Sequence, residues 1–159
     1  GTVALEMLQE VSALDIIITP VGGGGLLSGT SIVFDSLSPE TKVIGAEPDG
    51  ANDAFRSFYS GKIVPMINPQ TIADGLKTSL GDKTYPIIKK YVDEIVTVSE
   101  ESIIAAMRLI WERMKIIVEP SSCVTLAAIL ENKIPEKNKK IGVILSGGNV
   151  DLEKLPWKN

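Results

Sequence analysis

The sequence predicts an α/β fold in which an open, mostly parallel sheet carries helices on both faces. Short apolar runs alternate along the chain with segments whose apolar residues recur at helical spacing. The apolar runs are hydrophobic at nearly every position, as in 15–21 and 42–48, which is typical of parallel strands buried on both sides. A chain of 159 residues, 44% of them hydrophobic, is long enough to bury such a core.

The first half of the chain is predicted to alternate between helices and strands. Apolar residues recur at helical spacing from Val3 to Val11, so the chain is expected to open in a helix. Pro39 interrupts the next helical pattern, because a proline and the residue before it disfavour helical continuation. The predicted elements are a helix within 1–11, a strand over 15–21, a helix over 25–37, a strand over 42–48 and a helix over 52–61.

The second half is predicted to begin with an irregular connection over 62–81, because two prolines and two glycines interrupt it. Ser99 suits the N-cap of the clearest helix, and Pro120 suits the first position of a further, buried helix. The predicted elements are a helix over 84–92, a strand over 94–99, a helix over 99–115 with Ile103, Ile104, Met107, Ile110, Trp111 and Met114 on one face, a helix over 120–131 and a strand over 140–149.

Composition narrows the class of function. The net charge of −4 argues against nucleic acid or an anionic membrane as a partner. No apolar stretch approaches the ~20 residues of a membrane span. The chain has no histidine, which excludes Ser-His-Asp hydrolysis and His-ligated zinc. Its single cysteine, Cys123, cannot form an internal disulfide and is expected to be buried, so a reducing, cytoplasmic location is predicted.

Four consecutive glycines, Gly22–Gly25, follow the first predicted strand and open the next predicted helix. Glycine loses more conformational freedom on ordering than any other residue, so such a run needs a reason. At a helix N-terminus, bare N–H groups and the positive end of the helix dipole together favour a phosphate. The carboxyl ends of parallel strands are where ligands bind, and the glycine pair 147–148 also follows a strand. We interpret the run as a phosphate-binding loop; a tight turn or a close strand–helix contact is the structural alternative.

The glycines alone do not decide which phosphate ligand binds. A dinucleotide is the main alternative, because Glu47 ends the next strand, where an acidic residue would bind a ribose. The spacing fits poorly, since counting G-x-G-x-x-G from Gly22 or Gly23 places Leu27 or Ser28 at the third glycine. The P-loop pattern is absent as well. A Rossmann-type oxidoreductase domain and a non-catalytic binding fragment remain the alternatives.

Five motifs together carry a family resemblance. In chain order, and spanning Gly1 to about Leu152, they are VGGGGLLSG, GAEPDGAND, TIADGLKTSLG, WERMKIIVEPSS and VILSGGNVDL. They resemble the serine racemase and threonine dehydratase family of pyridoxal 5'-phosphate (PLP) enzymes, which has the tryptophan-synthase-β fold. The chain looks most similar to eukaryotic-type serine racemases and 3-hydroxyaspartate dehydratases. The resemblance implies that residues 1–159 form part of the large, PLP-binding domain of such an enzyme.

The resemblance also implies two sets of site residues. In the family, the tetraglycine loop binds the cofactor phosphate, and the serine of the SGGN motif faces the pyridine nitrogen of PLP. A Mg²⁺, Mn²⁺ or Ca²⁺ ion is held by two carboxylates and a main-chain carbonyl, which are ligands that suit these cations. The corresponding residues are Gly22, Gly23, Gly24, Gly25, Leu26 and Ser146 for the cofactor, and Glu47, Ala51 and Asp53 for the cation.

The activity implied by the resemblance is that of a homodimeric dehydratase or racemase acting on serine, threonine or 3-hydroxyaspartate. Such an enzyme removes the Cα proton, then either eliminates the β-hydroxyl, giving a 2-oxo acid and ammonia, or returns a proton to Cα. The family's Schiff-base lysine, the serine on the opposite face and the loop that binds the substrate carboxylate are expected upstream of Gly1. No catalytic residue is therefore assigned in this chain, and the chain alone is expected to be inactive.

Two further expectations concern regulation. Lys115 and Asn149 match positions that contribute to a nucleotide effector site in animal serine racemases. Few residues follow Leu152, too few for the amino-acid-binding domain of biosynthetic threonine deaminases. Inhibition by isoleucine is therefore not expected, because feedback requires a second site coupled to the first.

Overall fold

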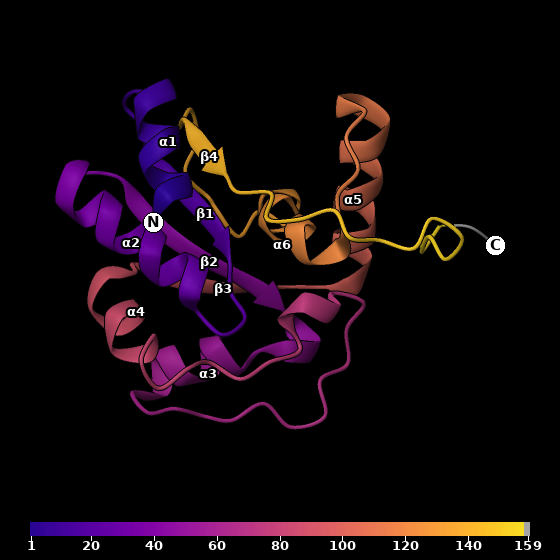
Figure 1. The fold of residues 1–159 in the computed structure, drawn as a ribbon, viewed down its shortest axis with the longest axis horizontal. Coiled ribbons are helices and arrows are strands. Elements are labelled where there is room, and N and C mark those ends of the chain that lie inside the picture. The colour runs from indigo at the N-terminus through magenta and orange to yellow at the C-terminus, as the bar shows by residue number, and fades with distance from the viewer. Residues whose placement is uncertain (158–159) are drawn as a thin grey trace.

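The structure, a computed structural model, describes residues 1–157 as a parallel sheet with helices on both sides (Figure 1). Residues 158–159, the end of the predicted domain, lie outside the described residues. The strands are β1 (Ile16–Pro20), β2 (Lys42–Pro48), β3 (Glu94–Val98) and β4 (Ile141–Val143), in the order β3-β2-β1-β4. The helices are α1 (Thr2–Glu10), α2 (Gly25–Leu37), α3 (Asp53–Ser60), α4 (Tyr85–Tyr91), α5 (Glu100–Met114) and α6 (Pro120–Leu130), with short 3₁₀ turns η1 (Asp49–Ala51) and η2 (Asp74–Leu76).

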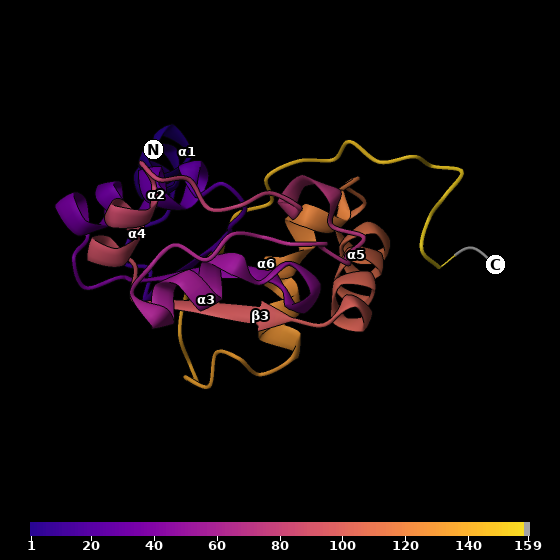
Figure 2. The ribbon, with the colours of Figure 1, turned by 90° about the horizontal axis from the view of Figure 1, so that it is seen from below.

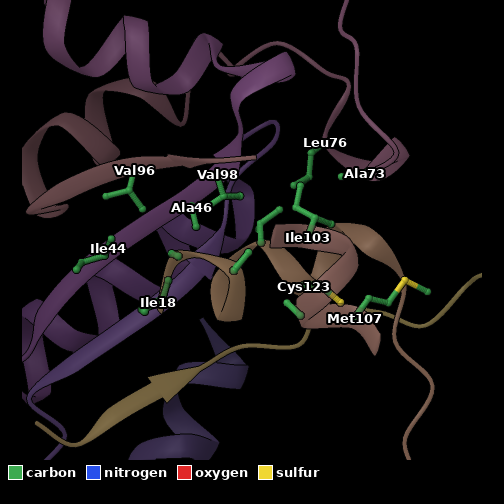
Figure 3. Close-up of a cluster of buried hydrophobic side chains, with 14 of the residues drawn as sticks. Ile18, Ile44, Ala46, Ala73, Leu76, Val96, Val98, Ile103, Met107 and Cys123 are labelled. Atoms are coloured by element: carbon green, nitrogen blue, oxygen red, sulfur yellow. The ribbon is translucent and has the colours of Figure 1, made fainter. Parts of the chain in front are cut away.

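Two apolar cores lie on opposite faces of the sheet, because successive side chains of a strand point in opposite directions. Ile16 and Ile18 of β1 belong to the core that α5 and α6 cover, whereas Ile17 belongs to the core formed with α1, α2, α3 and α4. In Figure 2, α5 and α6 lie together on the right, and α1, α2 and α4 lie together on the left. Figure 3 shows the first core, in which side chains of the sheet meet Ile103 and Met107 of α5. The predicted α/β fold is confirmed.

The last strand is shorter than the sequence predicts. The prediction covers 140–149, whereas β4 covers only Ile141–Val143. β4 pairs with β1, and just beyond it the N–H of Ile144 still donates to the carbonyl of Ile18 at 3.1 Å. The next donor on that side of β1 would be Pro20, which has no N–H, so the ladder ends there. The prediction is therefore wrong beyond residue 143, because an apolar run does not show where its partner strand stops bonding.

The helices agree with the predicted ranges to within a residue or two at each end. Ser99 is the N-cap of α5, as predicted, and its hydroxyl accepts the N–H of Ser102 at 3.2 Å. Met114, predicted on the apolar face of this helix, is exposed, because the buried residues of α5 end at Ile110. Cys123 is buried, as predicted, and burial raises the pKa of its thiol to about 12. Among residues 1–157, no helix has both the length and the apolar composition needed to cross a bilayer.

Candidate functional site

The glycine run forms a turn between β1 and α2 whose backbone N–H groups are unpaired. Gly24 is the N-cap of α2 and has a φ of +87°, in the left-handed region that favours glycine. Gly25 starts the right-handed helix, and a left-handed residue beside a right-handed one makes a concave backbone that binds anions. Within residues 1–157, the N–H groups from Gly23 to Leu26 donate to no protein acceptor. The turn therefore offers unpaired donors at the positive end of the α2 dipole.

The space around this turn differs from one glycine to the next. A Cβ atom on Gly24 would lie 2.7 Å from both Ile88 Cδ1 and Thr84 Oγ1, so neighbours on one side leave no room for it. A Cβ atom on Gly25 would meet nothing within 4 Å, and both Gly23 and Gly25 are exposed. The turn is thus closed towards α4 and open on the other side. Close packing, the structural alternative for the glycine run, accounts for Gly24 but not for Gly23 or Gly25.

The SGGN motif lies in an irregular segment that follows β4, and the start of α6 holds this SGGN segment in place. The Ser122 hydroxyl accepts the N–H of Gly147 at 2.7 Å and donates to the Gly147 carbonyl at 2.6 Å. The Glu119 carboxylate accepts the N–H of Asn149 at 2.9 Å. Ser146 is exposed, and its Oγ lies 3.4 Å from the Oγ of Ser122. The Ser146 hydroxyl is therefore accessible on a segment whose backbone is held by neighbouring side chains.

The glycine turn and the SGGN segment lie at the same edge of the sheet. β1 and β4 are hydrogen-bonded neighbours and run parallel, so their carboxyl ends point the same way. Gly22 follows the end of β1 closely, and Ser146 follows the end of β4. Ligands of open α/β sheets bind at this edge. The structure thus brings the predicted cofactor residues to the ends of two adjacent strands.

The predicted cation ligands lie between β2 and α3, in the interior. Glu47 is fully buried, and its carboxylate accepts the N–H groups of Ala54 at 3.3 Å and Phe55 at 2.6 Å. Asp53 is buried as well and accepts the N–H of Leu80 at 2.6 Å. Burial raises the pKa of Glu47 to about 8; the nearby Asp53 carboxylate adds to the rise, and the bonds from the two N–H groups oppose it. Burial also raises the pKa of Asp53.

These carboxylates do not by themselves complete a metal site. Ala51, the third predicted ligand, is buried in η1, which lies between Glu47 and Asp53 in the sequence. Within residues 1–157, no group of three or more His, Cys, Asp or Glu side chains is placed to hold a metal ion. A cation bound here would need main-chain carbonyl or water oxygens besides the carboxylates of Glu47 and Asp53, as hard cations commonly do.

Comparison with known proteins identifies the family. Residues 1–147 match the family described as "Pyridoxal-phosphate dependent enzyme". The chain belongs to this pyridoxal-phosphate dependent family. The match decides against the dinucleotide-binding alternative. It also identifies the cofactor as PLP, a ligand with a phosphate group, which is the chemistry that the open glycine turn suits.

The chain spans about half the length of the curated relatives that it matches in this family. The β-hydroxyaspartate dehydratase of Paracoccus denitrificans is 50% identical over 157 residues, which cover 99% of this chain and 50% of that protein. The crystal structure of serine racemase from Dictyostelium discoideum superposes with a TM-score of 0.90 at 56% identity, over 95% of this chain and 49% of that chain. The crystal structure of the T.th. threonine deaminase superposes with a TM-score of 0.91 at 43% identity, over 94% of this chain and 57% of that chain.

Sequence reasoning missed two side chains that hold the predicted cofactor residues in place. Thr84 contacts the glycine turn from 61 residues away, and Ser122 contacts the SGGN segment from 25 residues away. Thr84 lies outside the five motifs, and Ser122 ends the WERMKIIVEPSS motif, but only the fold shows which backbone groups each hydroxyl contacts. Of the two residues expected at an effector site, Lys115 is the C-cap of α5 and Asn149 is exposed on the SGGN segment. Within residues 1–157, no interaction joins Lys115 to Asn149.

Proposed function

We propose that this chain is the C-terminal part of the PLP-binding large domain of an enzyme that acts on serine, threonine or 3-hydroxyaspartate. In the full-length protein, the substrate loses its Cα proton. It then either eliminates the β-hydroxyl, giving a 2-oxo acid and ammonia after hydrolysis, or regains a proton at Cα. The observation that carries the proposal is the set of unpaired N–H groups on the open side of the glycine turn. The names of the similar proteins, serine racemase, β-hydroxyaspartate dehydratase and threonine deaminase, support the substrate class.

In this proposal, the N–H groups of Gly23, Gly24, Gly25 and Leu26 bind the phosphate of PLP. Hydrogen bonds from backbone N–H groups to an ionised phosphate are stronger than bonds between neutral groups, and the α2 dipole adds to them. The missing side chains at Gly23 and Gly25 let the phosphate approach the backbone closely. Bound at this edge of the sheet, PLP withdraws electrons from the Cα of the amino acid and so acidifies its Cα–H bond.

The Ser146 hydroxyl is proposed to face the pyridine nitrogen of PLP. A hydroxyl donates a hydrogen bond to a neutral nitrogen, whereas a carboxylate would hold that nitrogen protonated. A neutral ring withdraws fewer electrons. This suits a reaction in which negative charge at Cα is discharged at once, through departure of the β-hydroxyl or return of a proton. The bonds of Ser122 with Gly147 and of Glu119 with Asn149 support this role, because they fix the backbone that directly follows Ser146.

We also propose that Glu47, the Ala51 carbonyl and Asp53 bind a Mg²⁺, Mn²⁺ or Ca²⁺ ion. Two buried carboxylates near each other are costly unless a positive charge offsets them. Within residues 1–157, neither carboxylate forms a salt bridge with a Lys or Arg side chain. The available ligands are all oxygen atoms, which favour these hard cations over zinc.

The full-length enzyme is further proposed to be a cytoplasmic homodimer that binds neither nucleic acid nor membranes. The net charge of −4 disfavours polyanionic partners, and the buried thiol of Cys123 suits a reducing compartment. Met114 at the end of α5 and Ile116 and Ile117 in the segment before α6 are exposed, and a second subunit would remove such apolar side chains from water. Analytical ultracentrifugation of the full-length protein tests this point, and a monomer at micromolar concentration would contradict it.

The decisive experiment uses the full-length protein. After incubation with PLP and dialysis, we expect a visible absorbance band of bound cofactor and turnover of at least one of the three hydroxy amino acids. A 2-oxo acid would report elimination, and the opposite enantiomer would report racemisation. Protein that retains no cofactor under these conditions would contradict the proposal. Residues 1–159 assayed alone are expected to show no turnover.

A further inference from the structure

The segment before α4 contacts the glycine turn at one carbonyl. The Oγ of Thr84 donates to the carbonyl of Gly23 at 2.6 Å. The N–H of Gly81 donates to the same carbonyl at 3.1 Å. A carbonyl oxygen has two lone pairs, so both acceptor positions of Gly23 are taken by this one segment. The direction of the Gly23 carbonyl is thereby fixed.

The hydroxyl of Thr84 is not used to cap its own helix. Thr84 is the N-cap of α4, where a threonine side chain ordinarily accepts an N–H from the first turn. No such bond forms in α4. The Oγ lies instead 2.6 Å from the Gly23 carbonyl and 3.1 Å from the Gly81 carbonyl. The hydroxyl has a single proton, and the shorter distance assigns that proton to Gly23.

The direction of the Gly23 carbonyl determines where the N–H of Gly24 points. These two groups belong to one planar trans peptide unit, in which C=O and N–H point in opposite directions. Since the carbonyl points at Thr84 and Gly81, the N–H of Gly24 points away from them, towards the open side of the turn. The Gly24 carbonyl in turn accepts the N–H of Ser28, the first bond of α2, so the next N–H points back out of the helix N-terminus.

The segment that carries Thr84 is itself anchored. The buried Asp53 carboxylate accepts the N–H of Leu80 at 2.6 Å, and the Ser28 hydroxyl donates to the Thr84 carbonyl at 3.4 Å. Ile88, one turn into α4, is fully buried on the same side of Gly24. These contacts hold the segment that carries Thr84 in place. The segment therefore cannot shift as a whole relative to the glycine turn.

We propose that Thr84 is a positioning residue for the cofactor phosphate: by holding the Gly23 carbonyl, its hydroxyl aims the Gly24 N–H at a phosphate oxygen. This inference rests on the proposed function, in which the glycine turn binds PLP. It adds a residue that acts on the phosphate only through the backbone of Gly23 and Gly24.

The test compares the full-length wild type with Thr84→Val and Thr84→Ser. Valine keeps the branched shape and removes the hydroxyl, whereas serine keeps the hydroxyl. Dissociation constants are measured for PLP and for pyridoxal, which lacks the phosphate. We expect Thr84→Val to bind PLP about tenfold more weakly, since one hydrogen bond that orients the turn is lost. Pyridoxal binding should be unchanged in Thr84→Val, and Thr84→Ser should bind PLP as the wild type does.

Each other outcome counts against the inference. Equal losses for PLP and pyridoxal would show a general structural role for Thr84, and unchanged PLP binding would show no role. Thr84→Ala removes the same hydroxyl with less bulk beside Gly24, so it gives the same comparison if the valine variant does not fold. A wild type that binds no PLP would overturn the proposed function and this inference with it. If the wild type binds PLP and Thr84→Val binds it equally well, only this inference fails.

Discussion

The N-termini of α2 and α5 differ in what takes up their N–H groups. At α5, the Ser99 hydroxyl accepts the N–H of Ser102 at 3.2 Å, and Ser99 donates to Glu131 through its own N–H at 2.8 Å and its hydroxyl at 2.6 Å. At α2, the N-cap is Gly24, which has no side chain, and the N–H groups that follow it are unpaired within residues 1–157. One helix start has a side-chain cap that accepts one of its N–H groups, and the other has no side-chain cap.

This difference separates a capped helix start from the one at which a phosphate is proposed to bind. A side-chain cap contributes about 1 kcal/mol, so the glycine at the start of α2 forgoes stability that Ser99 supplies at α5. The start of α3 is an intermediate case, because the Glu47 carboxylate accepts two of its N–H groups but is itself buried. A helix start with free donors and open space is therefore the place to expect an anion, and the following predictions test this distinction.

The largest effect is expected at the open start of α2. Gly25→Asp in the full-length protein places a carboxylate where the phosphate is proposed to bind, and the like charges should weaken PLP binding by about 100-fold or more. Position 25 is preferable to position 24, because a Cβ atom meets nothing there, whereas Gly24 has a positive φ and no free space. Gly25→Ala adds a methyl group without a charge and is the control, so its loss of PLP affinity should be much smaller than that of the aspartate variant. Equal retention by the aspartate variant would remove the phosphate from this turn.

The next effect concerns the start of α3. Asp53→Asn keeps an acceptor for the N–H of Leu80 but removes one of the two carboxylates proposed to bind the cation. We expect cation affinity to fall by at least the ~10-fold that loss of a metal's outer-shell partner costs. The measurement is the rise in melting temperature with added Mg²⁺ or Ca²⁺. Asp49→Asn, the same change at an exposed neighbour, is the control. If Asp53→Asn gains as much stability from the cation as the wild type, the cation binds elsewhere.

A smaller effect is expected at the start of α5, which Ser99 caps. Ser99→Ala removes the cap and the hydroxyl bond to Glu131, so the full-length protein should lose about 1 kcal/mol of unfolding free energy. Affinity for PLP should not change, in contrast to the variants of α2. Chemical denaturation followed by circular dichroism measures the loss, and Ser36→Ala, an exposed serine of α2, serves as the control. A loss of PLP affinity in Ser99→Ala would erase the distinction between the two helix starts.

The smallest effect is a pH dependence at the same cap. Partial burial raises the pKa of Glu131, but the bonds from Ser99 and Ser102 outweigh it and hold the pKa below the ordinary 4.5. A lowered pKa in the folded state means that ionised Glu131 stabilises the fold above pH 4.5 and that this stabilisation is lost as the pH falls below it.

Glu131→Gln should accordingly lower the melting temperature at neutral pH, and the difference from the wild type should shrink on acidification below pH 4.5. Glu101 is an exposed acid in the first turn of α5, and Glu101→Gln serves as the control. Its melting temperature should differ less from that of the wild type, both at neutral pH and in acid. A destabilisation by Glu131→Gln that is independent of pH would mean that its charge plays no part in the cap.

Local sequence patterns predict most of the elements, because the information they use is local. The β-branched run at 15–21, the serine before Glu100 and the proline at 120 each act within one turn or one strand, and each element begins where these residues indicate. The end of β4 is different. It depends on a missing N–H at Pro20, more than a hundred residues earlier, so the apolar run alone leads to a strand that is too long.

The sequence by itself determined the α/β class, the helix and strand order and the position of the glycine run between β1 and α2, because periodicity and runs of glycine can be read without knowing any partner. Only the tertiary structure decided which donors remain free. Gly24 lacks room because Ile88 and Thr84 pack beside it, and the Gly23 carbonyl is held by a hydroxyl from 61 residues away. Hydrogen bonds and close packing act over a few ångströms of space whatever the distance along the chain, so no local pattern in the sequence reveals them.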